Sequence, residues 1–107
     1  MGKAAQVNSD GFVSEVLEFP GVVIVDFWGP GCAPCRALAP AVDAIAEANE
    51  GRAKVVKVNI AESDDVANHY GITTIPTILV FKNGDLIEQF MGVQSKAKLQ
   101  AVIDENA

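Results

Sequence analysis

Two cysteines, Cys32 and Cys35, are the residues of this chain whose type and spacing point most directly to chemistry. They are the only cysteines among its 107 residues, and Ala33 and Pro34 stand between them. Thiols this close can form a small disulfide ring without help from the rest of the fold. In the loop-entropy description such a ring stabilises a protein by about 2 kcal/mol, against about 4.7 kcal/mol for a loop of a hundred residues. The spacing therefore favours a disulfide that opens and closes reversibly over a permanent structural bridge.

Two other uses of the cysteine pair carry less weight. One is a pair of inert, buried thiols, and the other is a zinc site. A structural zinc ion normally takes four ligands, whereas this chain offers two thiols and a single imidazole, that of His69. We expect no metal site, and we expect His69 to be a solvated or capping residue at the end of its helix.

The segments on either side of the cysteines predict how they are held. Residues 22–27 are apolar and mostly β-branched, which is typical of a central strand buried on both faces. From Pro34 to about Asn49 the apolar residues recur with helical spacing, and Gly51 follows as a stop signal. A cysteine at the junction meets the free N–H groups and the positive dipole end of the helix, which favour its thiolate. Cys32 is therefore the candidate nucleophile, and Cys35, one turn into the helix, is the candidate resolving thiol.

The remaining elements follow from apolar spacing and from capping and turn residues. We expect a first helix with Phe12, Val13, Val16 and Leu17 on one face, a strand at 54–60, a helix capped by Ser63, strands at 76–81 and 86–91, and a last helix capped by Ser95. Asn83-Gly84 lies between the last two strands and is a strong signal for a hairpin. Alternating strands and helices followed by a hairpin predict an α/β fold with a mixed sheet and helices on both faces.

The length and composition of the chain limit the number of domains it can form and the classes of partner it can bind. Its length suits one domain spanning residues 1–107. With 8 basic against 14 acidic residues and a net charge of -6, there is no basic surface for nucleic acid or for an anionic membrane. The first residues lack the apolar segment of a secretory signal, and no run is long enough to span a membrane. We expect a cytoplasmic protein, the alternative being a mature periplasmic protein whose signal has been removed.

Several short segments together resemble the thioredoxin family, in the family's order and spacing. They are Val25-Asp26-Phe27-Trp28, Cys32-Ala33-Pro34-Cys35-Arg36, Ala39-Pro40, Tyr70-Gly71-Ile72, Ile75-Pro76-Thr77 and Phe81-Lys82-Asn83-Gly84. The resemblance implies the thioredoxin fold, a mixed five-stranded sheet flanked by four helices, and a protein-disulfide reductase that acts on client proteins. No cofactor site is visible, so the resemblance also implies a separate thioredoxin reductase as the electron donor. We expect a monomer.

Asp26 stands out from the sequence even without the resemblance. A carboxylate inside an apolar strand is costly to bury in its ionised form, so its pKa should be raised. By resemblance, Asp26 lies beneath the resolving cysteine and is the general base that deprotonates Cys35. Lys57 matches the family position that pairs with this carboxylate, although its alternating strand is also compatible with a solvated lysine.

The resemblance also supplies candidate substrate-binding residues. Pro76 is expected to be cis and to face the dithiol, with the Ile75 backbone pairing with a client peptide as an added strand. Trp28 is expected to pack against the active-site loop, and Gly92 to leave room for the client backbone. The same surface includes residues beside the dithiol and before the proline: Gly31, Ala33, Pro34 and Thr74.

The chain departs from the family pattern beside the nucleophile. Gly31 stands where the family usually has tryptophan, and Ala33 where it usually has glycine. Loss of a large apolar side chain predicts weaker or differently distributed recognition of clients, because aromatic residues often dominate interface energies. Thr73-Thr74 replaces the small or basic pair common in the family, which again bears on the choice of client.

Three other functions are compatible with the same fold. A thiol oxidant or isomerase of the secretory type would require a markedly oxidising dithiol, against which Asp26 and Pro34 argue. A non-catalytic scaffold subunit would not need its cysteines. A redox sensor for one specific client is the third alternative, which Gly31 makes less remote.

Overall fold

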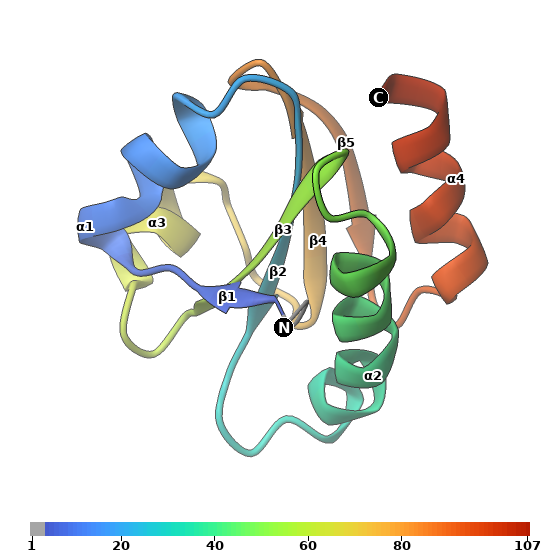
Figure 1. Ribbon diagram of the computed structural model, residues 1–107. Coiled ribbons are helices and arrows are strands. Elements are labelled where there is room, and N and C mark those ends of the chain that lie inside the picture. Colours follow the sequence, from blue (N-terminus) through green and yellow to red (C-terminus); the bar gives the residue numbers. More distant parts are fainter. Residues whose placement is uncertain (1–3) are drawn as a thin grey trace.

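The computed structural model describes residues 4–107 and contains one five-stranded sheet in the order β1-β3-β2-β4-β5 (Figure 1). Its strands are β1 (Ala5–Gln6), β2 (Val22–Trp28), β3 (Ala53–Asn59), β4 (Thr77–Lys82) and β5 (Asp85–Met91). Strands β1 and β2 run parallel to β3, whereas β4 is antiparallel to both β2 and β5. The mixed α/β sheet expected from the sequence is confirmed.

Helices cover both faces of the sheet, which places β2 and β4 in the middle of the molecule. Figure 1 shows α2 (Ala33–Ala48) and α4 (Lys96–Asn106) on one side, and α1 (Ser9–Phe12) and α3 (Asp64–His69) on the other. Each side has its own apolar cluster, and the alternation of side chains along β2 supplies both. Ile24 points toward α2 and α4, while Val25 points toward the opposite layer, and both are fully buried. The continuous apolar run 22–27 is thus explained by a strand covered on two faces.

The first helix differs from its predicted pattern at one position. Phe12 and Val16 are buried, but Val13 is 53% exposed. The chain winds into a π-helical turn, η1 (Val13–Leu17), in which the Glu18 amide donates to the Val13 carbonyl at 2.8 Å. Phe12 and Val16 are four residues apart and share the inward face, while Val13 is rotated toward solvent. The prediction that Val13 shares one helix face with Phe12 and Val16 is wrong.

Strand β1 was not among the elements expected from local patterning. It has only two residues, Ala5 and Gln6, which pair with Val56 and Lys57 of β3. The Val7 amide extends the pairing with a hydrogen bond of 2.8 Å to the Lys57 carbonyl. Two residues carry no periodicity, and neither alanine nor glutamine favours strands, so this edge arises from tertiary pairing alone.

Ser63 occupies the N-cap position of α3, as expected, but its side chain does not bond to the helix. Its hydroxyl oxygen instead accepts the Ser9 amide at 3.1 Å. Ser63 is buried, so this bond joins the start of α3 to the start of α1 across the same layer. The predicted helix start and N-cap residue are confirmed, whereas the bond that usually accompanies a serine cap is absent. Ser95, by contrast, accepts the Lys98 amide at 3.1 Å and caps α4 as expected.

The hairpin between β4 and β5 is confirmed, with Asn83 and Gly84 as its two turn residues. Both have positive φ, 51° and 85°, as a tight hairpin turn with right-handed strand twist requires. Asn83 also forms two hydrogen bonds with Gly21 in the loop before β2. Its backbone N–H donates to the Gly21 carbonyl at 2.9 Å, and its side-chain oxygen accepts the Gly21 backbone N–H at 2.8 Å. The hairpin is thereby attached to the central strand.

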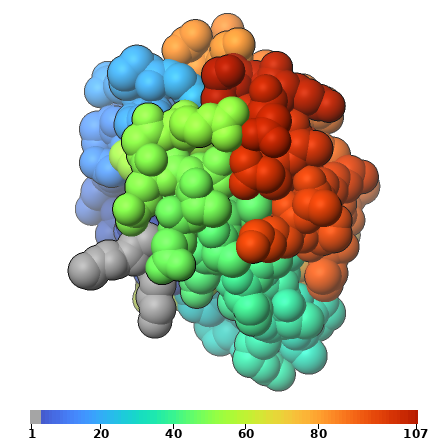
Figure 2. Space-filling view, turned by 45° about the vertical axis from the view of Figure 1, so that its right-hand side comes forward, coloured from blue at the N-terminus to red at the C-terminus, as the bar shows by residue number. Residues whose placement is uncertain are grey.

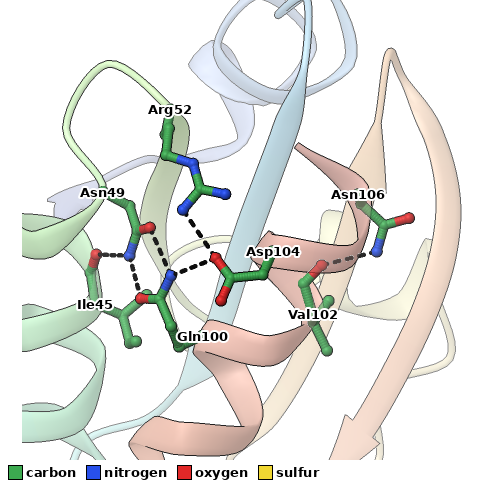
Figure 3. Close-up of polar contacts among 7 residues, drawn as sticks. All are labelled: Ile45, Asn49, Arg52, Gln100, Val102, Asp104 and Asn106. Carbon is green, nitrogen blue, oxygen red and sulfur yellow. Dashed lines mark hydrogen bonds and ion pairs between the residues drawn. The ribbon is translucent and has the colours of Figure 1, made fainter.

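Helices α2 and α4 lie side by side on the outer face in Figure 2, joined at one end by a polar network. The buried Asn49 side chain donates to the Ile45 carbonyl and to Gln100, each at 2.8 Å, and accepts from Gln100 at 3.0 Å. Figure 3 shows that Gln100 continues to Asp104, which also pairs with Arg52 at 2.8 Å. The network satisfies the end of α2 and fixes α4 against it.

Within residues 4–107 the structure has no helix of the length and apolar character needed to cross a membrane.

Candidate active site

Cys32 and Cys35 lie where the loop after β2 enters α2, at the lower end of the molecule in Figure 1. The two residues are joined by a disulfide, with their Cα atoms 5.3 Å apart. Cys32 occupies the N-cap of α2, and its sulfur accepts the Cys35 amide at 3.1 Å. Cys32 is partly exposed, whereas Cys35 is only 5% exposed. One sulfur is thus accessible and bonded to the start of the helix, and the other is covered.

The loop before β4 faces the accessible sulfur. The Ile75–Pro76 peptide bond is cis, as expected, and the Ile75 carbonyl oxygen lies 3.9 Å from the Cys32 sulfur. The Gly92 amide donates to the Pro76 carbonyl at 2.8 Å, and the Thr77 hydroxyl donates to the Thr74 carbonyl at 2.5 Å. These bonds hold the end of β5 and the start of β4 around the proline. The structure therefore brings Thr74, Ile75, Pro76 and Gly92 together opposite the dithiol.

The surface around Cys32 is open on the side of the preceding loop. Gly31, Ala33 and Pro34 are all exposed. Gly31 has φ +75°, and a Cβ there would meet no atom within 4 Å. Trp28 is half-buried, and its indole N–H donates to the Gln6 side chain at 3.3 Å. The tryptophan thus lies between the loop and strand β1.

A pocket of about 270 Å³ extends from this loop to the strands beneath it. Its lining includes Asp26, Trp28, Gly31, Cys35, Arg36 and Lys57. Asp26 and Lys57 are register partners on β2 and β3, so their side chains share the face that α2 covers. The pocket therefore joins the buried thiol to the two charged groups that the sequence singled out.

The Asp26 carboxyl is buried and binds its proton more tightly than an ordinary aspartate does. Its side chain is 1% exposed, and Oδ1 has no hydrogen-bond partner among the residues described. Burial raises the Asp26 pKa from 3.8 to about 6, with the Lys57 charge lowering it and the Asp43 charge raising it. The effect of burial is the largest, because a carboxylate in an apolar site loses its hydration. Asp26 can therefore exchange a proton close to neutral pH.

Lys57 forms its ion pair with Asp43 of α2, at 3.5 Å, rather than with Asp26. Its side chain is 15% exposed, so the alternative of a solvated lysine does not hold. The long, flexible stem of lysine lets its ammonium group reach along the strand face to the helix. Lys57 still lowers the pKa of Asp26 through its charge.

Among residues 4–107, no group of three or more His, Cys, Asp or Glu side chains could hold a metal ion. His69 is exposed at the end of α3, where its ring packs edge-on against Tyr70 with centroids 4.7 Å apart. The donor set for zinc is therefore not assembled in this part of the chain.

Among the polar and charged side chains of the site, Gln6, Arg36 and Asp43 were given no role from the sequence. Gln6 and Arg36 line the pocket, and Asp43 binds Lys57. A signal for Asp43 was present in the spacing, since Cys35, Ala39 and Asp43 recur every four residues and share one helix face. No sequence signal identified Gln6, because its position in the site depends on the pairing of the two-residue strand β1.

Comparisons with known proteins agree with this geometry. The family model described as Thioredoxin matches residues 3–105. "Thioredoxin 1" of Nostoc sp. is 45% identical over 106 residues, which cover 99% of each chain. "Thioredoxin M-type, chloroplastic" of Chlamydomonas reinhardtii is 46% identical over 96% of this chain and 74% of its own.

A solved structure shows the same fold. A mutant thioredoxin from Halobacterium salinarum NRC-1 superimposes with a TM-score of 0.88 at 29% identity, covering 97% of this chain and 90% of that one. The similarity thus spans the sheet, its helices and the dithiol loop alike. This chain belongs to the thioredoxin family of thiol–disulfide oxidoreductases.

Proposed function

We propose that this chain reduces disulfides of client proteins by two successive exchanges. The Cys32 thiolate attacks one sulfur of the client disulfide, forming a mixed disulfide and releasing the other client sulfur as a thiolate, which takes up a proton. Cys35 then loses its proton and attacks Cys32, which releases the second client thiolate, and that thiolate takes up a proton in turn. The client gains two electrons and two protons, and the protein is left with the Cys32–Cys35 disulfide.

One observation carries the assignment of the two roles. Cys32 is the partly exposed cysteine, and its sulfur accepts the Cys35 amide at the N-cap of α2. A thiolate at that place gains a hydrogen bond and the favourable end of the helix dipole, so its pKa should be lower than that of an ordinary thiol. The burial of Cys35 supports its acting only after a client is already attached to Cys32.

We propose that Asp26 is the base that accepts the proton lost by Cys35. The two residues line the same pocket, and the pKa of Asp26 is about 6, close to the working range of a base at neutral pH. Lys57 lines this pocket too and tunes the carboxyl through its charge. A proton would pass from Cys35 to Asp26, directly or through a water in the pocket, as Cys35 attacks.

We assign client binding to the backbone around the cis proline. The Ile75 carbonyl lies beside Cys32, and an extended client segment could add as a strand there, with Thr74, Pro76 and Gly92 forming its floor. Trp28, Gly31, Ala33 and Pro34 would contact the client from the other side. The lack of a large side chain at Gly31 favours clients that fill this space themselves.

The remaining partners follow from the chemistry. The oxidised protein must be recharged with two electrons, and we propose a thioredoxin reductase as their source. We further propose that the protein works as a single-domain monomer in the cytoplasm, where thiols are kept reduced.

Reduction of insulin by the protein, followed by turbidity, tests the proposal together with two matched variants. The unmodified chain should be faster than dithiothreitol alone, Cys32→Ser should be inactive, and Cys35→Ser should stall as a mixed disulfide with the client. If Cys32→Ser traps the client and Cys35→Ser does not, the two roles are reversed. If the unmodified chain is no faster than dithiothreitol, the reductase assignment is wrong.

A further inference from the structure

Two side chains of helix α2, those of Cys35 and Asp43, lie close to neighbouring residues of β2 and β3. Cys35, Ala39 and Asp43 follow each other at intervals of four residues on one helix face. Cys35 and Ala39 line the pocket that also contains Asp26 and Lys57. One turn beyond Ala39, a carboxylate oxygen of Asp43 lies 3.5 Å from the Lys57 ammonium.

Two carboxyl groups, those of Asp26 and Asp43, therefore lie near Lys57, and the lysine forms an ion pair with only one of them. Asp26 is its register partner on the neighbouring strand, yet the ion pair in the structure is with Asp43. The side chain of Asp43 is 32% exposed, so this carboxylate keeps much of its hydration while it pairs with Lys57. Asp43 is also held in place by the Ala4 amide, which donates to its Oδ1 at 3.2 Å.

We infer that Asp43 is a positioning residue that holds the Lys57 ammonium away from Asp26, so that Asp26 remains able to take up a proton near neutral pH. The inference rests on the proposed role of Asp26 as the base for Cys35. If Lys57 paired with Asp26 directly, the carboxylate would be stabilised and would become a weaker base. Asp43 thus acts on the reaction through Lys57 and does not touch the reacting sulfurs.

The other groups that face Asp26 do not offer the same control. Arg36 and the Cys35 sulfur line the pocket from α2, while β1 contributes the uncharged Gln6. The register partner of Asp26 on β4 is the apolar Ile78. Asp43 also raises the pKa of Asp26 directly through its own negative charge, an effect distinct from its action through Lys57.

The test is a titration of the Asp26 carboxyl by ¹³C NMR in the oxidised protein, in which neither sulfur takes up a proton. In Asp43→Asn the titration midpoint of Asp26 should fall by about one pH unit, because Lys57 is freed and a negative charge is lost. Asp43→Glu keeps the charge and should restore a midpoint close to that of the unmodified protein. Glu47→Gln, an exposed carboxylate on the same helix, is the matched control and should leave the midpoint unchanged.

A second background separates action through Lys57 from the charge of Asp43 itself. In Lys57→Gln, the additional change Asp43→Asn should move the midpoint by less than half as much as it does when Lys57 is present. An equal shift in both backgrounds overturns the inference, and so does an unchanged midpoint in Asp43→Asn. Thermal unfolding of each variant shows whether it is folded, and Asp43→Ser, which also removes the carboxylate, replaces Asp43→Asn if that variant is not.

Failure of the proposed base has a different signature. If Asp26→Asn releases the client from the mixed disulfide as fast as the unmodified protein at every pH, Asp26 is not the base for Cys35. The NMR midpoint of Asp26 reports on the placement of Lys57 whichever way that kinetic experiment turns out.

Discussion

Asp26 on β2 lies directly opposite Lys57 on β3 in the parallel pairing of the two strands, and both side chains face helix α2. The ion pair of Lys57 is nevertheless with Asp43, and the pKa of Asp26 is about 6 against 3.8 for an ordinary aspartate. A carboxyl that binds its proton more tightly in the folded than in the unfolded chain makes stability depend on pH. The protein therefore carries a stability cost for the group that we propose as the base for Cys35.

The first prediction concerns the stability of Asp26→Asn. Below about pH 3 the carboxyl is protonated in both states and costs nothing. As the pH rises from about 3 to about 6 the unfolded chain loses this proton first, so the unmodified protein loses stability, by at most roughly 3 kcal/mol. Urea unfolding of the oxidised proteins should show Asp26→Asn more stable by about 1 to 3 kcal/mol near pH 8 and equal near pH 3. A difference that is the same at both pH values would contradict the assignment of this cost to ionisation.

The second prediction concerns Gly31→Trp, with Gly31→Ala as its control. At φ +75° any L-residue is strained, so both variants should lose about 1 kcal/mol of stability. Only the tryptophan supplies an aromatic contact beside Cys32, so only Gly31→Trp should lower the KM for a protein client. The measurements are urea unfolding and steady-state insulin reduction. If Gly31→Ala lowered the KM equally, the missing indole would not be what limits recognition.

A third prediction compares two glycines with nearly the same backbone angle. Gly51 has φ +83° and open space around it, whereas a Cβ on Gly84, at φ +85°, would lie 2.5 Å from the Leu17 carbonyl oxygen. Gly51→Ala should cost about 1 kcal/mol from strain alone. Gly84→Ala should cost a further 1 to 3 kcal/mol, roughly, because the hairpin must move away from η1. Equal losses in urea unfolding would show that the hairpin can shift without penalty.

The fourth prediction concerns the network that joins α2 to α4 in Figure 3. Asn49→Ala removes bonds to Ile45 and Gln100 at a buried site, and it should lower the free energy of unfolding by about 1 to 3 kcal/mol. Asn106→Ala removes one bond within its own helix, to Val102, and should cost less than about 1 kcal/mol. Neither variant should alter insulin reduction at temperatures where it is folded. A slower reductase in Asn49→Ala would mean that the network reaches the dithiol.

Local signals predicted those elements whose cause is itself local. Asn83-Gly84 specifies its hairpin because both residues tolerate positive φ, and Ser95 specifies the start of α4 through a bond to an amide three residues on. The position of the dithiol loop was predictable for the same reason, because the strand before it and the helix after it both have clear local sequence patterns. The burial of Asp26 followed from the apolar residues around it in the strand.

Features that depend on distant segments were beyond the sequence. Ser63 has the residue type of a helix cap, but its hydroxyl is taken by Ser9, which comes from another helix. Strand β1 exists only because β3 offers it an edge. The partner of Lys57 could not be predicted either, because a helix face and a strand face must be superimposed before Asp43 and Lys57 meet.

The order of the strands determines when the active site can first take shape during synthesis. Strand β2 leads into the dithiol, and both of its neighbours in the sheet, β3 and β4, come later in the chain. A nascent chain that ends before β4 therefore lacks the strand that pairs with β2 on one side, and it also lacks the proline loop. The two cysteines leave the ribosome well before the groove that would select their clients, so until β4 is released the thiols are available to any oxidant or disulfide nearby.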